Sequence, residues 1–97
     1  MSRILRLVRF SATPEGAAAL EQLVSRDVVP INTRFGSETC RVIRALDPAD
    51  DFAIISVWSN REQLDAMRAQ PDYQALVAGI KQHTVSGLHE TLYEVLA

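Results

Sequence analysis

Few side chains in this sequence can take a proton near neutral pH: His83, His89 and the single thiol of Cys40. His83 follows Ile80 by three residues and Leu76 by seven, so a helix that continued this far would turn His83 toward the sheet. Histidine is the natural proton acceptor at neutral pH. We therefore take His83 as a candidate general base. The alternative is a solvated histidine at the end of a helix.

Nine of the ten basic residues are arginines. Four of them lie on two strands that we expect to be neighbours: Arg6, Arg9, Arg41 and Arg44. Arg9 and Arg41 are predicted to form cross-strand ion pairs at a dimer seam with a glutamate of the last strand, Glu90 or Glu94. Gripping an anionic ligand is the alternative role. Cys40 is interpreted as a small buried apolar residue, because a catalytic thiol needs an electropositive partner.

Composition excludes several classes of function. The 97 residues are 47% hydrophobic and 23% charged, with a net charge of −2, so no basic surplus is available for nucleic acid or an anionic membrane. No Cys/His cluster has metal-ligand spacing, and no glycine-rich loop could cradle a phosphate. We therefore expect no metal, no cofactor and no nucleic-acid partner.

The compartment is predicted from cysteine usage and from apolar runs. A single cysteine cannot form an intrachain disulfide, which favours a reducing, cytoplasmic location. The N-terminal apolar run is interrupted by Arg6 and Arg9, so we expect no signal peptide. No stretch reaches the roughly 18 to 20 apolar residues of a membrane span.

The elements that must position these side chains follow from periodicity and turn signals. Strands are predicted over residues 3–10, 37–46, 52–59 and 88–96, and helices over 14–29, 60–68 and 71–85. Thr13 is a suitable helix N-cap, and Pro30 is expected to end the first helix. The sequence Ser59-Asn60-Arg61-Glu62 has the pattern of a capping box. Ser86-Gly87 is expected to end the last helix.

The predicted order of elements is β-α-β-β-α-β, with the second helical region divided in two. This order is that of a ferredoxin-like α+β fold in a single domain, residues 1–97, with an antiparallel sheet covered by helices on one face. The third strand is apolar on both of its sides, so the second face would be left uncovered. Because a large exposed apolar face is a liability, we predict a homodimer formed by sheet-to-sheet packing.

A resemblance to a known family rests on the order of several fragments. They are Val8-Arg9-Phe10 with Pro14-Glu15-Gly16, Gly36 before Arg41-Val42-Ile43-Arg44-Ala45, and Asp51-Phe52 leading to Ser56-Val57-Trp58-Ser59, with Leu64 and Pro71 after them. In this order the chain resembles the antibiotic biosynthesis monooxygenase (ABM) domain family over nearly its whole length. The resemblance implies a dimeric α+β barrel. Some members oxygenate aromatic phenols or quinols without metal or flavin, and others degrade haem.

The same resemblance indicates site residues and departures from the family pattern. Trp58 occupies the family's tryptophan position and is expected to line a pocket, with Tyr73 at a position where many members carry histidine. The haem-degrading branch needs a histidine on the helix where this chain has Met67, so haem oxygenation is not expected. The anthrone-oxygenating branch has an asparagine and a tyrosine where this chain has Ile54 and Leu64.

Two functions follow from these observations. The first is a cofactor-independent monooxygenase for a phenol- or quinol-like molecule, bound between sheet and helices by Trp58, Ile54, Leu64 and Met67, with Tyr73 or His83 as the catalytic polar group. The second is a non-catalytic small-molecule binder or structural homodimer of the same fold. The tryptophan and the apolar roof favour the first function, and the departures from the family pattern favour the second.

Overall fold

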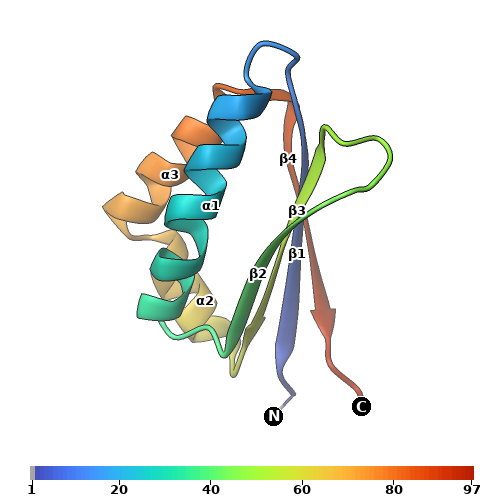
Figure 1. Ribbon diagram of the computed structural model, residues 1–97. Coiled ribbons are helices and arrows are strands. Elements are labelled where there is room, and N and C mark those ends of the chain that lie inside the picture. Colours follow the sequence, from blue (N-terminus) through green and yellow to red (C-terminus); the bar gives the residue numbers. More distant parts are fainter. Residues whose placement is uncertain (1) are drawn as a thin grey trace.

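The computed structural model describes residues 2–97 and has the predicted ferredoxin-like order of elements (Figure 1). Residues 2–97 form four strands and three helices: β1 (Ile4–Ala12), α1 (Ala17–Arg34), β2 (Thr39–Arg44), β3 (Asp51–Trp58), α2 (Arg61–Arg68), α3 (Pro71–Lys81) and β4 (Thr84–Glu94). The prediction of an α+β fold with a divided second helical region is confirmed.

The strands form one antiparallel sheet in the order β2-β3-β1-β4. β1 and β3 lie in the centre and pair over most of their length, from Ile4 opposite Trp58 to Ser11 opposite Asp51. All three helices cover the same face of the sheet, and the other face is bare (Figure 1). We call these the inner face and the outer face.

The inner face carries the core because side chains alternate along each strand. Val8, Phe10 and Ala12 of β1 are buried under the helices, and the ring of Phe10 stacks on that of Phe52 at 5.8 Å between centroids. The stripe on α1 that meets them is formed by Leu20, Val24 and Val28, which are fully buried.

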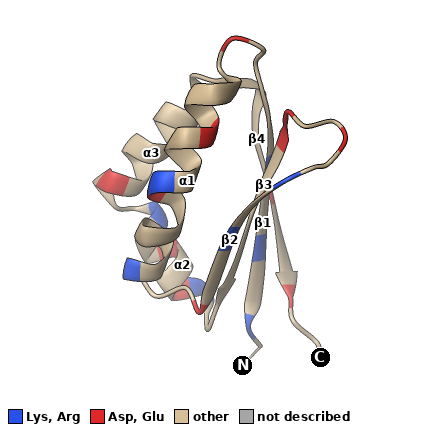
Figure 2. Ribbon diagram, in the orientation of Figure 1, with Lys and Arg blue, Asp and Glu red and all other residues tan. Residues whose placement is uncertain are grey.

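The outer face is apolar as well. Leu7 of β1 lies opposite Ile55 of β3, and the same face carries Leu5, Val57, Ile43, Val85 and Tyr93. Of these, Ile43, Val85 and Tyr93 are 44%, 50% and 49% exposed. Of the two central strands, β3 carries only one charged residue, Asp51 at its first position, and β1 carries Arg6 and Arg9 (Figure 2). The two-sided apolar pattern read from the sequence is therefore present in the fold.

The predicted bounds of α1 were wrong at both ends. The helix begins at Ala17, and Thr13 caps the preceding turn, its Oγ1 accepting the Gly16 N–H at 3.0 Å. The helix also continues through Pro30 to Arg34. Pro30 removes one backbone hydrogen bond on the exposed side, while Asn32 stays buried in the core beyond it. Packing of the inner stripe thus overrides the local proline signal.

Two further boundaries differ from the prediction. Asn60, one residue after Ser59, is the N-cap of α2, and its Oδ1 accepts the Gln63 N–H at 2.9 Å. At the other end, α3 stops at Lys81, and Ser86-Gly87 lies inside β4 rather than at the end of a helix. Both residues of this pair have positive φ, 64° and 73°, which a strand accommodates as a bulge.

Candidate functional site

A small, partly enclosed cavity lies between the inner face of the sheet and the helices. Its volume is about 20 Å³, and its walls come from β1, β3, β4, α1 and α3. Most of the lining is apolar: Val8, Val28, Ile54, Leu76, Val77, Ile80 and Leu88. Three polar side chains reach the same cavity, Arg6, Asn32 and Tyr73. An apolar space with a few convergent polar groups is the usual form of a small-molecule site.

Arg6 is the charged group of this cavity and is only 6% exposed. Its Nε donates to Glu90 Oε2 at 2.5 Å, and its Nη2 donates to the Tyr73 hydroxyl at 2.6 Å. Arg68 approaches the same carboxylate, with Nη1 3.4 Å from Glu90 Oε1. Arg68 Nη2 also lies 3.9 Å from Asp65 Oδ1. Glu90 is shared by two guanidinium groups, of which only Arg6 lines the cavity.

Asn32 and Tyr73 supply unused hydrogen-bonding capacity. Asn32 Nδ2 donates to the Val28 carbonyl at 2.8 Å, but Asn32 Oδ1 is buried without a partner. The Tyr73 hydroxyl accepts from Arg6, so its own hydrogen stays available for donation. A buried unpaired acceptor costs about 1–3 kcal/mol, so Asn32 is kept here against a stability penalty. The cavity thus offers one acceptor and one donor to a hydroxyl or carbonyl group.

The predicted substrate-binding residues divide into two groups. Ile54 lines the cavity together with Tyr73. Trp58, Leu64 and Met67 instead form a separate, fully buried cluster, against which Tyr73 packs. The Trp58 indole N–H is already used, because it donates to Ser56 Oγ at 2.9 Å. Trp58 therefore supports the ring of Tyr73 and does not face the cavity.

The structure places His83 away from this cavity. α3 ends two residues before it, so the helical spacing from Ile80 does not extend to His83. Its carbonyl accepts the Thr13 N–H at 2.8 Å, and its imidazole lies against Gly16, where an added Cβ would come within 3.0 Å of Nδ1. Of the two predicted catalytic side chains, only Tyr73 lines the cavity.

Within one chain, the glutamate of the last strand pairs with other arginines than those predicted. Arg6 and Arg68 pair with Glu90, whereas Arg9 and Arg41 form no ion pair among residues 2–97, and their pairing at a dimer seam stays a prediction. The alternation of β1 explains this: Arg6 shares the inner face with Val8, and Arg9 points outward. Counting back from Phe10 would have placed Arg6 inside. Asn32 was missed because the first helix was predicted to end at Pro30. Asn32 lies four residues after Val28 and continues the buried stripe of that helix.

Cys40 is buried, as the sequence suggested, and burial raises the pKa of its thiol to about 11 from the usual 9.0, with Arg41 and Arg6 acting weakly in the opposite direction. Between pH 9 and 11 the folded state therefore keeps a proton that the unfolded state loses. The free energy of unfolding should fall as the pH rises through this window. Urea unfolding at pH 8.5 and 10.5 measures the fall, which should be smaller in Cys40→Ala. Equal falls in the two proteins would contradict the assignment.

Metal sites and membrane spans are the two other classes of feature that bear on function. No group of three or more His, Cys, Asp or Glu side chains among residues 2–97 is arranged to hold a metal ion. None of the helices formed by these residues combines the length and apolarity that crossing a bilayer requires.

The profile of the antibiotic biosynthesis monooxygenase family matches residues 3–79, which is most of the chain. The protein therefore belongs to the antibiotic biosynthesis monooxygenase family. No curated protein matches the sequence.

Solved structures share the fold at low sequence identity. A putative antibiotic biosynthesis monooxygenase from Deinococcus radiodurans is 24% identical, with a TM-score of 0.87 over 97% of this chain and 93% of that one. A protein from Mycobacterium tuberculosis is 20% identical, with a TM-score of 0.88 over 99% and 97%. SnoaB from Streptomyces nogalater, a cofactor-independent oxygenase, is 16% identical, with a TM-score of 0.86 over 100% and 96%. These likenesses support the fold.

Proposed function

We propose that this protein is a cofactor-independent monooxygenase acting on a small phenol- or quinol-like molecule, held between the sheet and the helices at Arg6, Asn32 and Tyr73. The observation that carries the proposal is the unpaired Asn32 Oδ1, which shares an otherwise apolar cavity with the Tyr73 hydroxyl. Membership of the family supports the reaction class, and so does the fold shared with SnoaB, which is a cofactor-independent oxygenase.

In the proposed reaction, dioxygen oxidises a phenol, which loses two hydrogen atoms. A phenol with a free para position and O₂ give a para-quinone and water: one oxygen atom forms the new carbonyl, and the other leaves as water with the phenolic and ring hydrogens. The ionised phenol is the form that reduces O₂. The guanidinium of Arg6, which lines the cavity, favours that anion, and the proton of the phenol passes to water. The Tyr73 hydroxyl would donate to the phenolate oxygen.

Substrate entry requires part of the helical layer to move. A cavity of about 20 Å³ holds one molecule the size of water or dioxygen, and an aromatic ring is larger. Tyr73 and Val77 are the half-buried members of its wall on α3, beside the buried Leu76 and Ile80. In the proposed mechanism, the substrate displaces these side chains. The hydrogen bond between Arg6 and Tyr73 then breaks, and both residues contact the substrate instead.

Oxygen consumption with a panel of phenols and naphthols that have a free para position tests the proposal. Tyr73→Phe should lower kcat/KM roughly tenfold or more, because it removes a donor to a charged oxygen. The chain has one other tyrosine, Tyr93 on the outer face, and Tyr93→Phe provides a matched control that should keep the wild-type rate. Equal activity in the two variants would show that the reaction does not occur in this cavity.

We also propose that the active form is a homodimer in which the outer faces of two sheets pack together. The apolar residues of that face, Leu7 and Ile55 at its centre, support this arrangement. Light scattering of the wild type at micromolar concentration should give the mass of a dimer, and Ile55→Glu should give a monomer. Leu46→Glu, in the fully exposed turn after β2, adds the same charge and should leave the dimer intact. A stable wild-type monomer would contradict the proposal.

The size of the cavity favours a second candidate function. In a structural dimer of this fold, a cavity of about 20 Å³ would need no further opening, whereas a binder of anything larger than dioxygen would need it to open. This function predicts that no compound of the panel raises oxygen consumption above its spontaneous rate. It also predicts that the dimer forms as described above.

A further inference from the structure

The cavity of the proposed site comes nearest to solvent between α3 and β4. The half-buried members of its lining are Tyr73 and Val77 of α3 and Leu88 of β4, and the others are buried. β4 lies at an edge of the sheet, with β1 as its neighbour. A molecule that enters from solvent therefore has its least covered path between these three side chains, and we call this path the edge opening.

The side chains along the edge opening lie at two levels. At the first level Arg6 joins the two sides, because its Nη2 donates to the Tyr73 hydroxyl at 2.6 Å and its Nε to Glu90 Oε2 at 2.5 Å. Val77 lies one turn after Tyr73, about 6 Å further along α3. Leu88 lies two residues before Glu90, about 7 Å along β4. Since α3 and β4 run in opposite directions (Figure 1), Val77 and Leu88 lie together at the second level, which is apolar.

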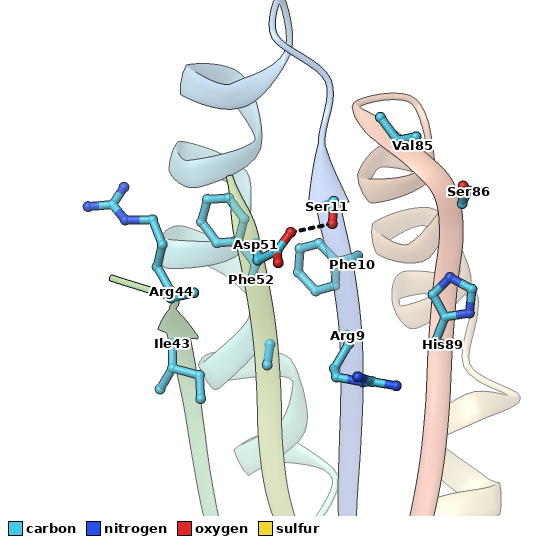
Figure 3. Close-up of a pocket in the computed structure, with 12 residues that line it drawn as sticks. Arg9, Phe10, Ser11, Ile43, Arg44, Asp51, Phe52, Val85, Ser86 and His89 are labelled. Atoms are coloured by element: carbon cyan, nitrogen blue, oxygen red, sulfur yellow. Dashed lines mark hydrogen bonds between the residues drawn. The ribbon is translucent and has the colours of Figure 1, made fainter. Parts of the chain in front are cut away.

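β4 is irregular at Leu88. In the pairing with β1, three residues of β4 (86–88) stand opposite Phe10 alone. Extra residues of this kind leave part of a strand unpaired and bend it. The next residue, His89, lies on the outer face beside Arg9 (Figure 3), so Leu88 takes the inner face by alternation. The irregularity thus leaves an apolar side chain at the edge opening on backbone that is not paired with β1.

The proposed dimer leaves the edge opening free. Its interface is the outer face, where a hollow of about 590 Å³ is lined by residues of all four strands (Figure 3). A second copy packed on that face covers this hollow, whereas the edge opening lies on the face that carries the helices. The inner cavity therefore keeps its path to solvent in the dimer.

We infer that Val77 and Leu88 form the gate of the cavity and determine how large an aromatic ring system it admits. This inference rests on the proposed function, because it treats the cavity as the substrate site. The two branched side chains have to move apart before a ring can enter a space of about 20 Å³. Truncation of either one widens the edge opening and leaves the polar groups of Arg6, Asn32 and Tyr73 in place. The gate therefore selects substrates by size, and the polar groups select them by chemistry.

Anaerobic titration with phenol and 1-naphthol tests the gate, because binding is then measured without the reaction. The backbone amide resonances of the full chain are followed, and those of α3 and of residues 87–90 should shift. Val77→Ala removes two methyl groups, so the affinity for 1-naphthol should rise roughly tenfold relative to that for phenol. Leu88→Ala should raise the same ratio from the β4 side. Val29→Ala is the matched control, because Val29 is also half-buried and packs against the core but does not line the cavity.

A ratio of affinities that stays at the wild-type value in Val77→Ala or in Leu88→Ala would overturn the inference. An equal rise in Val29→Ala would also overturn it, because the cause would then be a general loosening of the core. So would the absence of saturable binding of both compounds in every variant. Gated binding without oxygen consumption would contradict the proposed reaction alone. Oxygen consumption that depends on Tyr73, with an unchanged ratio of affinities, would contradict the gate alone.

Discussion

Replacement of Trp58 by alanine is expected to lower the free energy of unfolding by about 3–5 kcal/mol. The indole is fully buried with Leu64 and Met67, and its N–H donates to Ser56 Oγ. Alanine removes both the packing and the donor, and leaves a cavity that α2 and the end of β3 would have to close. The loss is large for a 97-residue domain, whose total stability is about 5–15 kcal/mol.

Urea unfolding followed by circular dichroism measures this loss. Trp58→Phe keeps part of the packing and should fall between the wild type and alanine. Leu46→Ala, at a side chain that is fully exposed, should stay within about 0.5 kcal/mol of the wild type. A Trp58→Ala protein that lost less than about 1 kcal/mol would show that Trp58 is not the anchor of this cluster. It would also reopen the sequence-based prediction that the indole faces a ligand.

Asn32→Leu is expected to change stability and activity in opposite directions. Leucine has a similar size and removes the buried Oδ1 that has no partner, so the free energy of unfolding should rise by about 1 kcal/mol. The same change removes the acceptor that we assign to the hydroxyl of the neutral phenol before it ionises, so kcat/KM should fall roughly tenfold. A polar residue kept at a stability cost is typical of a functional site.

The two effects are measured on one preparation, by urea unfolding and by oxygen consumption with the best compound of the panel. Leu76→Met is the matched control, because it changes the cavity wall while nearly conserving volume, and it should keep most of the activity. An Asn32→Leu protein that is destabilised by several kcal/mol would show that Asn32 serves packing. Full activity in this variant would remove Asn32 from the proposed site.

The fold could be predicted from the sequence because each element carried its own signal. Strand alternation, the stripe of Leu20, Val24 and Val28, and Pro71 at the start of α3 all indicate the observed order. The boundaries were less predictable, because local signals compete with packing. Pro30 is such a case: the helix continues through it, since Asn32 is buried beyond it.

The site was harder to predict, because it depends on contacts between residues far apart in the chain. Tyr73 was selected by resemblance, and its partner Arg6 lies 67 positions earlier. Nothing local marks Asn32 Oδ1 as unpaired, since a lone asparagine on a helix is usually solvated. For His83 a local signal was misleading. The helical spacing of Leu76 and Ile80 was extended to His83, but the helix ends at Lys81.

Oxygenation under ¹⁸O₂, with metal chelator present, tests the central proposal most directly. The proposed mechanism predicts a quinone product that carries one labelled oxygen atom, formed faster than the spontaneous reaction, with the rate lost in Tyr73→Phe and kept in Tyr93→Phe. Product formed at the spontaneous rate with every compound of the panel, or equally fast in Tyr73→Phe, would contradict the proposal that this cavity is an oxygenase site.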